Sequence, residues 1–194
     1  MLSKLASTII SDLTGEEPDA SLTLTSGELA VAEPGMLDEY SVLDEQVAAG
    51  TYPVFVHMSD QDLDEMPTAG VDGIWLRLGD SPVTRWEEAT TADDEPLVDE
   101  DDLIGFCLGD AETFESDDDI GDEIQTLFED DCTTDGVGYV EDKVVVVYVG
   151  EVAREHRFYC GFDNANKLVA LVGVFRYPDD DDDDFDDDFD DDFE

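Results

Sequence analysis

The sequence predicts an α+β fold: a β-rich single domain of mainly antiparallel strands, with two or so helices and a disordered acidic C-terminal tail. Short segments rich in β-branched and aromatic residues recur along the chain, and no regular strand–helix alternation supports a parallel sheet. Hydrophobic residues make up 41% of the 194 residues, which is too much for a wholly disordered acidic chain. Residues 179–194 consist of Asp, Glu and Phe alone, which predicts a solvated tail.

The N-terminal segment is predicted to be helical. Its apolar residues recur at helical spacing: Leu2, Leu5, Ile9 and Leu13. Gly15 follows them and can end a helix. We therefore interpret residues 1–20 as an N-terminal helix and linker.

Residues 21–178 are interpreted as one β-rich domain. Its expected strands are the segments 21–25, 28–32, 51–58, 71–78, 83–86, 103–108, 144–149, 157–162 and 168–175. Pro53 indicates an edge strand or a strand start, because proline cannot donate a ladder hydrogen bond. Residues 120–128 carry a helical apolar pattern, and the Asp and Asn residues of the segment 163–167 predict the turn of a closing hairpin.

The charge of the chain indicates the salt concentration to which the protein is adapted. The sequence has 55 Asp and Glu residues against 8 Lys and Arg, a formal net charge of −47. Residues 179–194 hold 13 of these acids, so residues 1–178 keep 42 acids and 8 bases, a net charge of −34. Such self-repulsion opposes the compact state in dilute buffer, whereas at molar salt the Debye length falls to about 3 Å. The composition therefore predicts a halophilic, salt-adapted protein.

The same arithmetic excludes several classes of protein. A basic nucleic-acid-binding surface is incompatible with this charge, so no nucleic-acid partner is expected. No run of 18 apolar residues exists, and the N-terminus lacks the continuous apolar stretch of a signal peptide. We therefore expect no membrane contact and a cytoplasmic location.

Neither a metal nor a cofactor is expected. Cys107, Cys132 and Cys160 are odd in number and widely spaced, which favours free buried thiols over disulfides or a zinc site. Residues 131–142 loosely follow the spacing of a calcium loop, but a strand-like segment follows them, so a simple Asp-Gly turn is the better interpretation. No glycine-rich phosphate loop occurs.

Several segments, taken together and in order, resemble one protein family. They are Ser-Gly-Glu-Leu-Ala-Val-Ala-Glu-Pro-Gly at 26–35, Ala-Gly-Thr-Tyr-Pro-Val at 49–54, Pro-Val-Thr-Arg-Trp-Glu-Glu-Ala at 82–89, Gly-Phe-Cys-Leu-Gly at 105–109, and Tyr-Cys-Gly-Phe-Asp followed by Leu-Val-x-x-Phe within 159–175. This pattern is similar to the DUF4241 family and covers about residues 22–176. The resemblance implies the boundaries of the fold; the family carries no established activity.

Two segments depart from the family pattern. Residues 153–156 replace its Gly-Asp-Gly stretch, and residues 109–112 replace its Asp-Ala-Gly-Thr run. If those family segments form a site, the resemblance implies that this chain lacks it.

Catalytic groups cannot be identified from pairs of carboxylates, because in a chain with 55 acids such pairs occur by chance in nearly every short segment of the sequence. The chain has two histidines, His57 and His156. His57 lies in a strand pattern and is interpreted as structural, whereas His156 is expected to be exposed. Catalysis would need one of them to meet Cys107 or Cys160 in space, and no local pattern predicts that meeting.

Two groups of residues are candidates for partner binding. Phe185, Phe189 and Phe193 recur four apart among Asp residues in the tail, a pattern that suits docking into an apolar groove of a protein partner. The second group is basic and falls in the last third of the chain: Lys143, Arg154, Arg157, Lys167 and Arg176. These bases either pair with nearby acids or form a face for an anionic partner or for the tail.

The sequence thus favours a non-enzymatic binding or regulatory module with an acidic aromatic tail. A hydrolase-like enzyme, with a site built from dispersed acids and His57, remains the first alternative, so the question of catalysis stays open. An acidic nucleic-acid mimic is a further alternative, although charge attraction is weak at molar salt. The sequence does not determine the oligomeric state.

Overall fold

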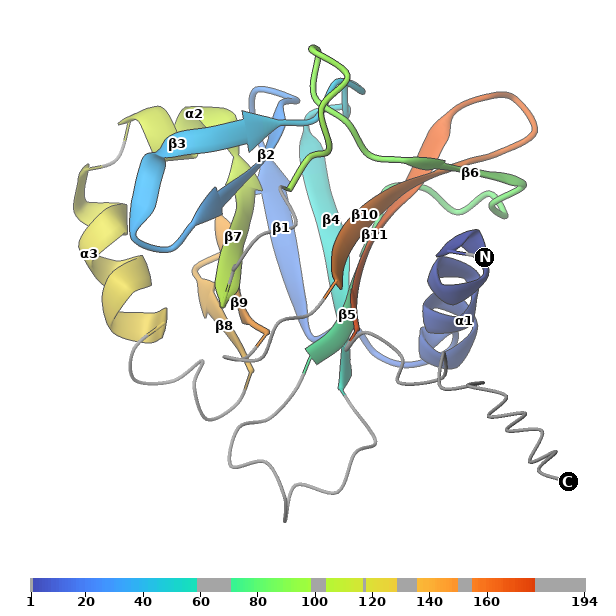
Figure 1. The fold of residues 1–194 in the computed structure, drawn as a ribbon, viewed down its shortest axis with the longest axis horizontal. Coiled ribbons are helices and arrows are strands. Elements are labelled where there is room, and N and C mark those ends of the chain that lie inside the picture. The colour runs from blue at the N-terminus through green and yellow to red at the C-terminus, as the bar shows by residue number, and fades with distance from the viewer. Residues whose placement is uncertain are drawn as a thin grey trace, which may run out of the picture.

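Two antiparallel sheets packed face to face form the centre of the molecule (Figure 1). The structure is a computed structural model, and it describes residues 2–58, 71–98, 104–116, 118–128, 136–149 and 155–176. All strand pairs among these residues are antiparallel, which confirms the predicted fold class.

The first sheet has six strands in the order β1-β4-β5-β11-β10-β6. They are β1 (Ala20–Leu24), β4 (Gly50–Met58), β5 (Val71–Arg77), β6 (Arg85–Glu88), β10 (Glu155–Phe162) and β11 (Leu168–Arg176). The closing hairpin, β10 and β11, is therefore inserted between β5 and β6 and makes up the middle of the sheet.

The second sheet has five strands in the order β3-β2-β7-β9-β8. They are β2 (Leu29–Glu33), β3 (Met36–Val42), β7 (Gly105–Asp110), β8 (Val137–Val140) and β9 (Val144–Tyr148). Every residue of β7 and β9 is buried, because both faces of this sheet are covered.

The main core lies between the two sheets. Alternate residues of each strand point into it, as the period of two in a strand requires. Phe106 of β7 packs against Phe158 of β10 and Phe175 of β11, with ring centroids 5.3 and 5.0 Å apart. These contacts join the two sheets at their centres.

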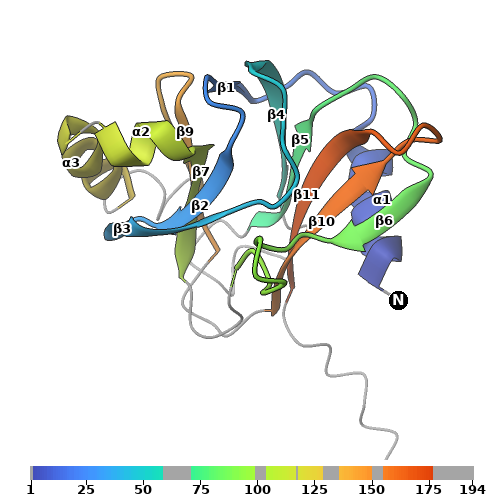
Figure 2. The same cartoon turned by 90° about the horizontal axis from the view of Figure 1, so that it is seen from above.

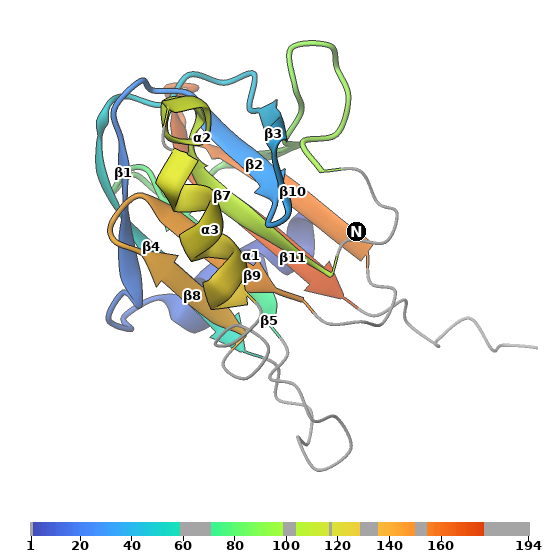
Figure 3. The ribbon, with the colours of Figure 1, turned by 90° about the vertical axis from the view of Figure 1, so that its left-hand side faces the viewer.

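Helices cover both outer faces, so the molecule has four layers (Figure 2). Helix α1 (Leu2–Leu13) packs Ala6, Ile9 and Leu13 onto the outer face of the six-stranded sheet. Helices α2 (Ala111–Ser116) and α3 (Asp118–Leu127) cover the five-stranded sheet on the opposite side (Figure 3).

The structure confirms most of the expected elements and adds some. The N-terminal helix, the helix near 120–128 and the closing hairpin are present, the last with Asn166 in the left-handed region at φ 62°. Helix α2 and the strands β3 and β8 were not predicted, and strand boundaries shift by a residue or two. No helix among the described residues is long and apolar enough to cross a membrane.

Two expectations need correction. His156 is buried at 3% exposure beside Phe175, because it lies on the inward face of β10, whereas exposure was expected. Pro53 lies within β4, which is an interior strand. Pro53 is paired on one side only: β1 pairs with it through Ser21, whereas the pairing of β4 with β5 begins at Val54. At this residue β4 is therefore locally an edge, which is where a proline is tolerated.

Candidate functional site

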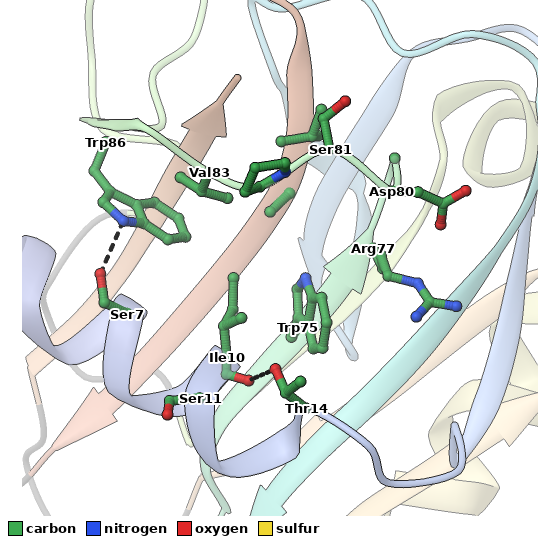
Figure 4. A pocket seen from close by; sticks show the side chains of 14 residues that line it. Ser7, Ile10, Ser11, Thr14, Trp75, Arg77, Asp80, Ser81, Val83 and Trp86 are labelled. Carbon is green, nitrogen blue, oxygen red and sulfur yellow. Dashed lines mark hydrogen bonds between the residues drawn. The ribbon is translucent and has the colours of Figure 1, made fainter. Parts of the chain in front are cut away.

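A pocket of about 510 Å³ opens between helix α1 and the outer face of the six-stranded sheet (Figure 4). Three segments far apart in the sequence form it: α1 with the residue that follows it, the chain from the end of β5 to the start of β6, and the start of β11. Its lining residues are Ser7, Ile10, Ser11, Thr14, Trp75, Arg77, Gly79, Asp80, Ser81, Pro82, Val83, Trp86, Val169 and Ala170. A volume of this size falls within the range of small-molecule sites.

Trp75 forms one wall of the pocket and belongs to an aromatic stack. It faces outward from β5 and stacks on Phe55 of β4, with centroids 4.6 Å apart and planes at 21°. The guanidinium carbon of Arg77 lies 5.4 Å from the centroid of Phe55 and 5.9 Å from that of Trp75. A cation held over ring faces gains electrostatic stabilisation, so this stack positions Arg77 at the pocket.

Trp86 forms another wall and is tied to helix α1. Its indole Nε1–H donates a hydrogen bond of 3.0 Å to the hydroxyl oxygen of Ser7 (Figure 4). Gly161 of β10 leaves room for it, since a Cβ there would come within 3.0 Å of the Trp86 ring and 2.9 Å of Val83. Trp75 and Trp86 are the two tryptophans of the sequence, so all of its indole fluorescence arises at this pocket.

The loop after β5 is held close to the hairpin. The backbone N–H groups of Leu78 and Gly79 both donate to the carbonyl oxygen of Val169, over 2.9 and 3.0 Å. A Cβ at Gly79 would lie 3.0 Å from the side chain of Val169, so glycine permits the close approach. Backbone hydrogen bonds from Lys167 and Ala165 and the Ser81 hydroxyl lower the pKa of Asp163, and this network anchors the loop to the hairpin turn.

Two donors of the pocket have no acceptor among the described residues. Trp75 is 8% exposed, and its Nε1–H makes no hydrogen bond there. No carboxylate of the described residues lies within ion-pair distance of Arg77, although the sequence contains 55 acids. Buried donors are nearly always satisfied in folded proteins, so the unpaired N–H of Trp75 indicates a place for a ligand's acceptor. Arg77 is exposed at the same pocket and adds a positive charge.

The structure separates His57 from the two described cysteines, so these residues bring together no histidine–thiol pair of the kind that thiol catalysis uses. His57 lies on the helix α1 face, where its Nε2 is 3.6 Å from a carboxylate oxygen of Asp12. Cys107 packs under α2 and α3 on the opposite outer face, and Cys160 points into the core between the sheets. The two sheets therefore lie between His57 and Cys107.

The two described cysteines are buried and neither forms a disulfide, as the sequence predicted. The Cys160 sulfur lies 3.8 Å from a carboxylate oxygen of Glu45. Burial, together with the Glu45 charge and its hydrogen bond, raises the pKa of this thiol well above its usual range. Cys160 is thus a core side chain and a poor nucleophile. Cys132 lies outside the described residues.

The predicted partner-binding residues are spread out where the structure describes them. Arg157 donates to a carboxylate oxygen of Glu88 over 2.7 Å near the start of β10, and Lys167 lies at the turn at the other end of the hairpin. Lys143 precedes β9 and lies 3.4 Å from Glu141. The remaining ones lie outside the described residues or have side chains that do: Arg154, Arg176, Phe185, Phe189 and Phe193.

A buried carboxylate joins two of the family-like segments. Asp110 is fully buried at the junction of β7 and α2. It accepts hydrogen bonds from the backbone N–H of Thr25 (2.6 Å), Ser26 (2.9 Å) and Glu112 (3.0 Å), and from the Ser26 hydroxyl (2.8 Å). Burial alone would raise the pKa of Asp110, but these hydrogen bonds outweigh it and hold the pKa below its ordinary value. The arrangement fixes the β1–β2 turn against the start of α2.

Sequence reasoning did not identify the pocket. Its residues come from positions 7 to 14, 75 to 86 and 169 to 170, and no motif spans them. The available signal was the presence of Trp86 in a family-like segment of a chain with two tryptophans. Among the described residues, no three His, Cys, Asp or Glu side chains converge as metal ligands would.

Comparison with known proteins places the chain in a family. The profile described as "Protein of unknown function (DUF4241)" matches residues 22–152, which is more than half of the chain. No curated protein and no solved structure matches significantly. The matched segment contains β5 and the loop at the pocket, whereas α1 and β11 lie outside it. On the strength of this match, the chain belongs to the DUF4241 family.

Proposed function

We propose that this protein is a non-enzymatic binding module and that the pocket beneath helix α1 is its binding site. One observation carries the proposal: two tryptophans and an arginine line a preformed pocket, and Trp75 and Arg77 hold donors with no acceptor among the described residues. Apolar walls with a few convergent polar groups are typical of ligand sites.

Binding is favoured over catalysis by the chemistry of the lining. The lining contains a single carboxylate, that of Asp80, together with hydroxyl groups, indole rings and one guanidinium. It contains neither histidine nor cysteine, so neither a serine–histidine nor a cysteine–histidine pair faces the pocket. A hydrolase site built around His57 would lie elsewhere, and the described residues bring no thiol to His57.

The test is a ligand screen at molar KCl with thermal unfolding followed by tryptophan emission. A compound that binds the folded state at a hundred times its Kd stabilises the protein by about 2.7 kcal/mol. We expect at least one metabolite to raise the Tm of the wild type. The same metabolite should not change the Tm of the Ile10→Phe variant, because the larger side chain fills the pocket.

Met58→Phe is the matched control. It adds an aromatic ring at a residue that is 40% exposed and does not line the pocket, so it should respond to the ligand like the wild type. A screen in which no compound distinguishes the wild type from Ile10→Phe would refute the proposed site.

We also propose that the module is halophilic and cytoplasmic and that its acidic tail docks onto a protein partner. The regular spacing of Phe185, Phe189 and Phe193 supports the docking role. The full chain and its F185S/F189S/F193S variant, immobilised at molar KCl, should differ in the proteins they retain. Identical retained proteins would remove the docking role and leave the pocket proposal intact.

A further inference from the structure

We propose that the pocket selects a small ligand that combines a planar apolar body with a single carboxylate, and that the carboxylate is received by Trp75 and Arg77. This inference rests on the proposed function and names the class of ligand. Its elements are an indole N–H, a guanidinium and an aromatic wall, all of which line one pocket.

The first donor is the indole N–H of Trp75. Figure 4 shows its nitrogen on the edge of the ring that faces the loop carrying Ser81 and Val83. The nitrogen is shielded and has no acceptor among the described residues. Leaving such a donor unpaired costs about 1–3 kcal/mol, which a ligand acceptor would recover. Because the nitrogen is shielded, we expect neighbouring side chains to shift when the acceptor enters.

The second donor is Arg77. The residue is exposed at the mouth of the pocket, and Phe55 and Trp75 hold its guanidinium over their ring faces. Arg85 and Arg157 differ from it, since Arg85 pairs with Glu87 and Arg157 pairs with Glu88. In a chain with a net charge of −47, an arginine that the described acids leave unpaired is a specific feature of this pocket. A guanidinium fork matches the geometry of a carboxylate.

The remaining walls suit a planar apolar body. Trp86 presents its ring to the pocket and is fixed by its hydrogen bond to Ser7, so the ring offers a rigid stacking surface. Ile10, Val83 and Val169 add aliphatic contacts. A planar aromatic ring has the flat apolar faces that these side chains can contact.

Asp80 limits the charge of the ligand. Figure 4 shows Asp80 and Arg77 on the same side of the pocket, and Asp80 is the one carboxylate of its lining. A second negative charge on the ligand would meet this carboxylate and be repelled. The pocket therefore favours a monocarboxylate over a phosphate dianion.

The experiment compares two probes of equal shape on the full chain at molar KCl, by ¹⁹F NMR. The probes are 4-fluorobenzoate, which carries a negative charge, and 4-fluorobenzyl alcohol, which is neutral. A hydrogen bond to a charged group contributes about 1.5–3 kcal/mol, so we expect 4-fluorobenzoate to bind about tenfold or more tightly than the alcohol.

Two variants test the assigned donors. Arg77→Gln removes the charge, and Trp75→Phe removes the N–H but keeps an aromatic ring; each should bring the two probes to within about threefold of each other. Arg85→Gln removes the same charge outside the pocket lining and should keep the wild-type preference. Far-ultraviolet circular dichroism confirms that each variant is folded.

The tail carries similar chemistry, because its phenylalanines are flanked by aspartates. The F185S/F189S/F193S variant of the full chain separates the two sources. Tighter binding of 4-fluorobenzoate in this variant than in the wild type would show that the tail competes for the assigned site. Unchanged binding would show that the site is open to a free ligand.

Equal affinities for the two probes, or a preference that survives either Arg77→Gln or Trp75→Phe, would overturn the inference. Absence of 4-fluorobenzoate binding from the wild type and from the tail variant would overturn it too. None of these results contradicts the proposed function, because the metabolite screen with the Ile10→Phe variant tests whether the pocket binds a ligand of any chemical class.

Discussion

At the scale of single residues, Asp110 shows how a chain with a large excess of acids uses one carboxylate inside the fold. Among the acids whose side chains the structure describes, Asp110 is the buried one, and it accepts four hydrogen bonds from Thr25, Ser26 and Glu112. A carboxylate can accept all of them because it has two oxygens and no proton to place. The residue therefore connects the β1–β2 turn, the end of β7 and the first turn of α2.

Replacing this carboxylate by an amide should destabilise the protein. Asp110→Asn puts an NH₂ group where donors already point, so we expect a loss of about 2–3 kcal/mol in the free energy of unfolding. Urea unfolding at a fixed molar KCl concentration measures it. Asp122→Asn, an exposed acid on α3, is the matched control and should change the free energy by less than about 0.5 kcal/mol.

The same residue gives a pH dependence. The folded pKa of Asp110 lies below its ordinary, unfolded value of about 3.9. Its contribution is therefore complete above pH about 4 and is lost as the pH falls through the folded pKa. The difference between wild type and Asp110→Asn should be constant from pH 5 to 7 and shrink below about pH 4. A difference that persists unchanged at pH 2 would contradict this assignment.

At the scale of elements, helix α1 depends on the small residues beneath it. Gly73 of β5 lies under the helix, where a Cβ would come within 2.4 Å of the Ile9 side chain and 2.9 Å of the backbone oxygen of Gly173. The end of a side chain can move aside, but a carbonyl of the neighbouring strand cannot. Glycine at this position thus permits both the β5–β11 pairing and the close packing of α1 that forms the pocket.

Gly73→Ala should therefore loosen α1. Overpacking of this kind costs about 1–3 kcal/mol, and displacement of the helix would weaken the hydrogen bond between Ser7 and Trp86. We expect a lower Tm and a shifted tryptophan emission maximum at molar KCl. Gly35→Ala is the control, because a Cβ there meets only Gln125 at an ordinary 3.7 Å. A native-like emission spectrum in Gly73→Ala would show that α1 tolerates the methyl group.

At the scale of the whole molecule, we expect the surface charge to decide the salt concentration at which the fold is stable. The sequence has 8 Lys and Arg residues against 55 acids, so most of the acids have no cation of the chain to pair with. Repulsion among them opposes compaction, and mobile ions screen it within about 3 Å at 1 M salt.

We expect the circular dichroism signal of the folded state to be lost as KCl is lowered well below molar. Sucrose is the control, because it favours burial by exclusion from the surface but does not screen charge. Refolding by KCl and not by sucrose would confirm that screening is the cause. A protein that stays folded and monomeric in near-pure water would contradict the halophilic interpretation.

Much of the fold could be predicted because burial leaves a local pattern. The alternation in residues 21–25 and the β-branched run at 144–149 predicted β1 and β9, and Asn166 marked the hairpin turn. The patterns failed where burial is weak or interrupted: β3 is an edge strand in which no residue is buried, and β8 contains Gly138. Helix α2 has six residues, which is too short for a clear helical period.

The sequence by itself determined the β-rich composition, the helical N-terminus, the buried thiols and the excess of charge, because each of these is a property of local segments or of their sum. Only the tertiary structure decided that β11 lies between β5 and β10, that α1 covers them, and that His57 and Cys107 occupy opposite faces. The pocket depends on that arrangement, since Ser7, Trp75 and Val169 meet only when segments far apart in the chain pack together. Contacts between distant segments leave no periodic signal in either one, so the candidate site became visible only in the folded molecule.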